Sequence, residues 1–171
     1  MIERTAIISK DGQYRYWLER EFKGLFTGPL PLVFCMLNPS TADGKTDDAT
    51  IRRCISFAQR ENASGVVVVN LFALRSTSPA TLMGHVDPVG PRNTEFLEKA
   101  VEASKDAFYD KPQIVCAWGD CGHRKRQEFA VNLFRKKEVK LMCLGTSNLG
   151  FPRHPLYVKK TQKLEEWKPN I

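Results

Sequence analysis

The chain has 171 residues, which is enough for one domain with a sizeable apolar core. Its 26 Lys and Arg residues outnumber its 19 Asp and Glu residues, and the formal net charge of +7 favours an anionic partner such as nucleic acid. No apolar run is long enough to cross a membrane, and residues 1–4 are not followed by the apolar segment of a signal peptide. We therefore expect a cytoplasmic, monomeric protein that does not contact a membrane; a basic enzyme without a nucleic-acid partner would have the same composition.

The N-terminal segment predicts a β-hairpin. Residues 5–9 and 14–18 are rich in β-forming side chains, and Asp11 and Gly12 lie between them. Asp-Gly between two such runs is a typical hairpin turn. We therefore expect two antiparallel strands ahead of the main sheet.

Four apolar runs farther along the chain predict strands that are buried on both faces. These strands span residues 32–37, 65–70, 114–118 and 139–144. Helices are predicted at 50–61, 91–104, 123–137 and 160–167, with one further turn near 79–83 inside the polar loop 73–93. Alternating strands and helices predict an α/β fold: a three-layer α/β/α domain over residues 1–171, with a central four-stranded parallel sheet and the N-terminal hairpin.

The five cysteines do not suggest a metal centre. Cys35, Cys116 and Cys143 fall inside the predicted strands, where a reduced thiol behaves as a small apolar side chain. Cys121 and His123 could form half of a metal site, but the sequence has no second ligand pair at a suitable spacing. We expect neither a metal nor another cofactor.

Polar residues follow the predicted strands at their carboxyl ends. Asn38, Asn70 and Trp118 end three strands, and His154 lies in the loop after the fourth. These ends share one edge of a parallel sheet, where α/β proteins bind ligands. An amide can both donate to and accept from the edge of a nucleobase, and a histidine can donate to an oxygen that gains negative charge. The pattern favours a nucleobase site.

Each of these residues also has an ordinary structural interpretation. Asn38 could fix the turn before Pro39, Asn70 could cap a loop, and Trp118 could belong to the core. His154 could be a surface histidine. The basic residues of the predicted helix 123–137 could simply keep one helix face in solvent.

Four short motifs in order resemble the uracil-DNA glycosylase superfamily over roughly residues 31–160. MLNPS at 36–40 lies where that superfamily has a water-activating loop, and VVVNLFAL at 67–74 is similar to its base-reading strand end. VCAWGDCGHRK at 115–125 resembles its third strand, and HPLY at 154–157 resembles its HPSP loop. The chain also resembles an uncharacterised bacterial and phage family that carries NPSTAD and HPLY together. The N-terminal hairpin lies outside the match.

The resemblance implies a monofunctional DNA glycosylase, which flips a nucleotide out of double- or single-stranded DNA and cleaves its glycosidic bond. Asn38 would orient the attacking water, and His154 would stabilise the oxygen of the departing base. Asn70 would read the base edge, with Ser40, Phe72 and Trp118 around the base. The superfamily pattern implies DNA contacts by the following residues: Pro39, Thr41, Lys45, Arg124, Lys125, Arg153, Leu156 and Tyr157.

Two departures from the superfamily pattern bear on the reaction. Asn38 replaces the carboxylate of the most active members, and an amide cannot take a proton from water. Asp43 is our candidate for the substitute carboxylate; Asp47, Asp48 and Asp87 are further ones, although helix capping suits Asp47 or Asp48.

Ser40 replaces a tyrosine that excludes bases substituted at C5. This change favours a 5-substituted pyrimidine as substrate, with damaged or mispaired bases next. Either DNA repair or defence against modified phage DNA would use such an enzyme. Two alternatives stay open: an enzyme that acts on free nucleosides or nucleotides, and a non-catalytic nucleic-acid-binding protein.

Overall fold

The computed structural model describes residues 1–24, 28–105 and 111–170. Its strands are β1 (Ile2–Ile8), β2 (Arg15–Phe22), β3 (Leu32–Met36), β4 (Gly65–Asn70), β5 (Gln113–Cys116), β6 (Lys140–Cys143) and β7 (Glu165–Glu166). Its helices are α1 (Ala49–Arg60), α2 (Pro79–Gly84), α3 (Asn93–Ala103), α4 (Arg124–Lys136) and the 3-10 turn η1 (Pro155–Tyr157). The mixed α/β class is therefore confirmed, and most elements lie within two residues of their predicted ranges.

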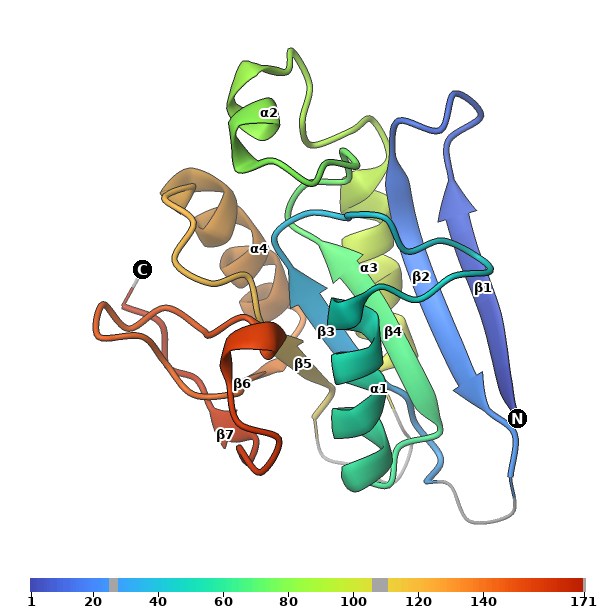
Figure 1. Ribbon diagram of the computed structural model, residues 1–171. Helices are drawn as coiled ribbons and strands as arrows, with labels where there is room; N and C mark the ends of the chain where they lie inside the picture. Colours follow the sequence, from blue (N-terminus) through green and yellow to red (C-terminus); the bar gives the residue numbers. More distant parts are fainter. Residues whose placement is uncertain (25–27, 106–110, 171) are drawn as a thin grey trace.

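All seven strands form one mixed sheet in the order β1-β2-β4-β3-β5-β6-β7 (Figure 1). The central strands β4, β3, β5 and β6 pair in parallel. The hairpin of β1 and β2 is not a separate unit, because β2 pairs antiparallel with β4, Leu18 opposite Val68. The expected four-stranded sheet is thus extended at both edges, since β7 pairs antiparallel with β6.

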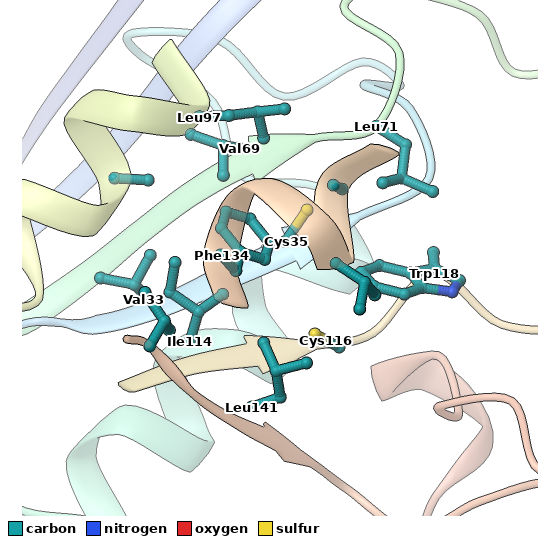
Figure 2. Close-up of a cluster of buried hydrophobic side chains, with 14 of the residues drawn as sticks. Val33, Cys35, Val69, Leu71, Leu97, Ile114, Cys116, Trp118, Phe134 and Leu141 are labelled. Carbon is teal, nitrogen blue, oxygen red and sulfur yellow. The ribbon is translucent and has the colours of Figure 1, made fainter. Parts of the chain in front are cut away.

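Helices cover both faces of the sheet. On one face, side chains of β3, β4, β5 and β6 pack against α3 and α4, and Figure 2 shows Phe134 of α4 and Leu97 of α3 within this cluster. On the other face, Phe34, Val68 and Val115 pack against α1. Strand β4 is buried along its whole length, as its run of four valines predicts.

At its first residue, Gly65, strand β4 runs very close to β2 of the hairpin. A Cβ atom on Gly65 would lie 2.3 Å from the carbonyl oxygen of Arg20. Glycine at this position therefore lets the hairpin join the edge of the parallel strands.

The loop between β3 and α1 is held by a buried arginine of the hairpin. Arg20 is fully buried, and its Nε lies 2.6 Å from Oδ1 of Asp47. Its guanidinium also donates to the carbonyl oxygens of Asp43 (2.6 Å) and Thr46 (3.3 Å). Asp48 then caps α1 by accepting the backbone N–H of Ile51 at 2.9 Å. The hairpin thus fixes the loop that carries the NPSTAD motif.

The prediction of a closing helix at 160–167 is wrong. This segment has no helix and instead supplies β7, which pairs Glu165 and Glu166 with β6. Trp167 is buried against Trp118, with ring centroids 5.3 Å apart, and its Nε1 donates to the carbonyl oxygen of Gly150. Burial of one large aromatic side chain and pairing with a sheet edge outweigh the weak helical preference of this short segment.

Among the helices that the structure describes, none combines the length and apolar character that crossing a membrane requires.

Candidate active site

A cleft of about 740 Å³ opens at the carboxyl ends of β3 and β5. Its walls come from the loop after β3, the start of α1, the loop after β5 and the segment that leads into η1. Six of the predicted site residues line it: Asn38, Ser40, Trp118, Arg153, His154 and Tyr157. The cleft has the volume of a small-molecule site and could hold a nucleotide.

Asn38 both braces a loop and presents an acceptor to the cleft. Its Nδ2 donates to the carbonyl oxygens of Pro39 (3.0 Å) and Ser76 (2.8 Å). Within the described residues its Oδ1 receives no hydrogen bond. The structural interpretation of Asn38 is therefore correct, and the same bonds turn its oxygen into a fixed acceptor for water or ligand.

His154 is held as a neutral donor. Its Nδ1 accepts the backbone N–H of Leu156 at 3.3 Å, so the proton of the neutral ring resides on Nε2. Burial lowers the pKa of His154 below its ordinary value, and the charge of Asp48 opposes that shift. The backbone that carries this ring is tied to α1, because Arg53 donates to the carbonyl oxygens of Pro155 and Val158.

Asn70 lies one layer beneath the cleft. Its side chain is almost fully buried and is not part of the cleft lining. Its Oδ1 accepts a hydrogen bond from Nη2 of Arg15 at 3.3 Å, and Arg15 does line the cleft. The structure therefore brings Asn38 and His154 into one cleft and separates Asn70 from it by an arginine.

Phe72 also lies outside the lining. It is buried, and its ring packs edge-on against His123, with centroids 4.8 Å apart. His123 lines the cleft. Phe72 thus supports a wall residue from behind.

Asp43 holds a turn and does not line the cleft. Its Oδ1 accepts the backbone N–H groups of Lys45 and Thr46 and the Thr46 hydroxyl, each at 2.8 Å. These hydrogen bonds lower the pKa of Asp43 to about 2. The carboxylates that do line the cleft are Asp48 and Asp120, and only Asp48 is half-buried. Of the carboxylates considered as substitutes, Asp48 therefore lines the cleft and Asp43 does not.

Trp118 belongs to both the core and the cleft. It is 2% exposed and its Nε1 donates to Oε1 of Gln127 at 3.2 Å. Ser40 lies half-buried on the lining near the NPSTAD loop.

The residues predicted to contact DNA lie around the mouth of the cleft and beyond it. Arg153 and Tyr157 line it, and Tyr157 is 79% exposed. Thr41 borders an adjoining hollow that shares Ser40 with the cleft. Lys45, Lys125 and Leu156 are exposed outside the lining, and Arg124 pairs with Glu128; Pro39 is buried.

The cysteines do not gather at the cleft. Cys35, Cys54, Cys116 and Cys143 are buried free thiols, and burial raises the pKa of Cys35 to about 12. Cys121 lines the cleft and is half-buried. In residues 1–24, 28–105 and 111–170 no group of three His, Cys, Asp or Glu side chains is placed to hold a metal ion.

Arg15 is a lining residue that sequence reasoning missed, and Asp48 was named only as a further candidate carboxylate. Arg15 lies in the hairpin, far from the motifs, and a charge in a β-forming run gives no sign that it will be buried. Asp48 has the pattern of a helix cap, and it is one. The capping pattern gave no sign that α1 begins at the cleft wall, which places Asp48 on the lining.

These observations define a mixed α/β protein with a polar cleft at the carboxyl ends of its parallel strands. Residues 15–156 match the family described as protein of unknown function DUF1643, and the chain belongs to this family. Searches of curated proteins and of solved structures found no match.

Proposed function

We propose that the protein is a monofunctional DNA glycosylase that excises a modified, 5-substituted pyrimidine or a damaged pyrimidine and leaves an abasic site. The observation that carries this proposal is that Asn38 and His154, 116 positions apart in the chain by their numbers, present a free acceptor and a neutral donor to one cleft. Resemblance to uracil-DNA glycosylases adds support, because it assigns water orientation and base stabilisation to these same positions. The net charge of +7 suits a DNA substrate.

In the proposed reaction, water replaces the base at C1′ of the sugar. The bond between C1′ and the base nitrogen breaks, and its electron pair leaves with the base. Nε2–H of His154 donates to the base oxygen on which negative charge gathers, which is how a fixed donor stabilises a leaving anion. The oxygen of a water held by Oδ1 of Asn38 then bonds to C1′.

The proton of the attacking water needs an acceptor, and Asp48 is our candidate. It lines the cleft with Asn38 and His154, and its charge acts on the ring of His154. A carboxylate that takes this proton supplies the general base that an amide at position 38 cannot supply. Asp48 thus replaces Asp43 in the mechanism.

The surroundings of the cleft support a base that is larger than uracil. Ser40 is half-buried on the lining, at the position where the superfamily resemblance implies a tyrosine that would exclude C5 substituents. Tyr157 is exposed on the lining and Leu156 is exposed next to it in the chain, and one of these side chains would fill the gap left by a flipped nucleotide. Lys125 and Arg153 would contact backbone phosphates.

A cleavage screen tests the proposal. Duplex and single-stranded oligonucleotides with uracil, 5-hydroxymethylcytosine, 5-hydroxymethyluracil or glucosylated 5-hydroxymethylcytosine are incubated with the protein, then treated with alkali, which breaks the strand at abasic sites. We expect strand breaks with at least one modified base, and their loss in Asn38→Ala and His154→Ala. The matched control is His85→Ala, which changes a histidine outside the cleft lining.

The outcomes separate the alternatives. Normal strand breakage by both variants would remove the site assignment. Binding with a steep salt dependence but no cleavage would favour a non-catalytic nucleic-acid-binding protein. Hydrolysis of free nucleosides without cleavage of DNA would favour the small-substrate enzyme.

A further inference from the structure

Strand β2 carries two buried arginines whose surroundings differ. Arg20 is 0% exposed, and its guanidinium is paired with Asp47 and with several carbonyl oxygens. Arg15 is 2% exposed, and the described residues give it only the carbonyl oxygen of Ala42 (3.0 Å) and Oδ1 of Asn70 (3.3 Å). One buried cation therefore has a carboxylate partner, and the other has neutral acceptors alone.

Donors of Arg15 and of its neighbour remain without acceptors. Among the described residues, neither Nε of Arg15 nor Nδ2 of Asn70 makes a hydrogen bond. Both atoms are buried, and a buried donor without a partner costs free energy that a suitable acceptor would recover. Nη2 of Arg15 already contacts Asn70, so the two unsatisfied donors belong to one hydrogen-bonded pair, of which Arg15 lines the cleft and Asn70 lies beneath it.

The charge around this pair is also unbalanced. Arg75 repels Arg15, and Nε of Arg75 is a further buried donor without a partner among the described residues. Asp48 attracts Arg15, but among the described residues no hydrogen bond joins the two side chains. The first turn of α1 faces the cleft with Thr50 and Ile51, and the amino end of a helix favours negative charge.

We propose that the floor of the cleft binds an oxyanion of the ligand, a carboxylate or a phosphate group, through the guanidinium of Arg15, which Asn70 contacts from beneath. An oxyanion supplies an acceptor to this guanidinium and offsets its buried charge, whereas a neutral carbonyl supplies an acceptor only. The inference deepens the proposed function by naming a charged group on the substrate. It rests on that function only in taking the cleft as the substrate site.

Calorimetric titration of the full chain with four small probes tests the inference and identifies the source of the oxyanion. Uracil is compared with uracil-5-carboxylate, and uridine with uridine 5′-monophosphate. We expect at least one anionic probe to bind about tenfold more tightly than its neutral counterpart, the size of a hydrogen bond to a charged group. Preference for the carboxylate assigns the oxyanion to the base, and preference for the phosphate assigns it to the nucleotide backbone.

Two variants act on the floor in different ways. Arg15→Gln removes the charge, and Asn70→Asp gives Arg15 a carboxylate of its own; both should abolish the preference for the anionic probe. Lys99→Gln removes an equal charge from α3, where Lys99 pairs with Glu95 outside the cleft, and should leave the preference intact. Circular dichroism and Tm of each variant show whether it is folded.

The inference fails if the wild-type protein binds charged and neutral probes equally. It fails as well if a folded Asn70→Asp or Arg15→Gln variant keeps the preference. Because these titrations measure binding alone, a failed cleavage screen beside an intact anionic preference would refute the glycosylase proposal and leave the oxyanion site standing.

Discussion

The ring of His154 and the backbone of Leu156 are joined by a hydrogen bond of 3.3 Å, in which Nδ1 accepts the N–H. A protonated imidazole has no free acceptor, so this bond exists only while the ring is neutral. The local turn at η1 therefore selects the tautomer that has its proton on Nε2.

Activity should decline on the acid side below the ordinary histidine pKa of 6.5. Burial lowers the pKa of His154, so the neutral donor persists at and above pH 6.5 and is lost as the pH falls through the lowered value. A pH profile of kcat/KM on the substrate from the cleavage screen measures this decline. His154→Gln should remove the acid-side decline along with most of the activity, and His85→Gln should keep the decline. An acid midpoint above 6.5 would contradict the neutral-donor role.

The same shift has a consequence for stability. Between the lowered pKa and 6.5 the unfolded chain binds more protons at this residue than the folded chain does, so stability rises with pH through this window. The contribution is complete above pH 6.5 and disappears as the pH falls through the folded-state value. Comparison of Tm against pH for the wild type and His154→Gln should show a shallower slope in the variant, and equal slopes would contradict the shift.

Asp48→Asn separates catalysis from helix capping. Asparagine caps a helix about as well as aspartate does, so Tm should stay near that of the wild type, whereas Asp48→Ala should lose about 1 kcal/mol of stability. As the proposed base is gone in both, activity should fall by about 10²-fold in each. The pKa of His154, followed by NMR, should fall further because Asp48 raises it. A fully active Asp48→Asn variant would exclude Asp48 as the base.

Asp43→Ala should have the opposite effects, a lower Tm and a nearly unchanged kcat. The three hydrogen bonds of Asp43 hold the turn at residues 43–46, so their loss should lower Tm. Because Asp43 does not line the cleft, kcat measured well below Tm should change little. Loss of kcat in a folded variant would return Asp43 to the mechanism.

Sequence patterns were most informative where one signal dominates. The valine run of β4 and the apolar periodicity of α1 and α4 placed these elements within two residues, because burial of those side chains determines the local structure. Local signals did not reveal which edge of the sheet the hairpin joins. That choice depends on Gly65 and on contacts between strands far apart in the chain.

The cleft was predictable in part for the same reason. Asn38 closely follows one parallel strand, and His154 lies in the loop after another. Since the ends of parallel strands share one edge of the sheet, the topology predicts that these two residues lie near each other. The guanidinium of Arg15 between Asn70 and the cleft could not, since it depends on how a side chain of β2 crosses above the end of β4. Sequence patterns predict where strands end, but they do not predict which side chains from neighbouring strands pack over those ends.

Binding of DNA should weaken with salt in proportion to the phosphates contacted. Lys125 is exposed just inside α4, and α4 begins next to His123 on the cleft wall. Removal of one phosphate contact in Lys125→Gln should reduce the slope of log affinity against log salt by about 1. Fluorescence anisotropy between low and moderate salt measures it, with Lys99→Gln as the matched control. Equal slopes in all three proteins would place the DNA elsewhere.

Ser40→Tyr tests the preference for a substituted base. Ser40 is half-buried on the lining, so a phenol at this position would take up space where a C5 substituent would lie. Excision of the substituted base should fall about tenfold or more relative to its counterpart with hydrogen at C5, since a misfit in a pocket of fixed shape acts on one substrate and spares the other. Ratios of kcat/KM for the two bases measure the change, and Ser40→Ala should keep the wild-type ratio. If Ser40→Tyr slows both substrates equally, then the wall at position 40 does not face C5, and selectivity must arise from another part of the cleft.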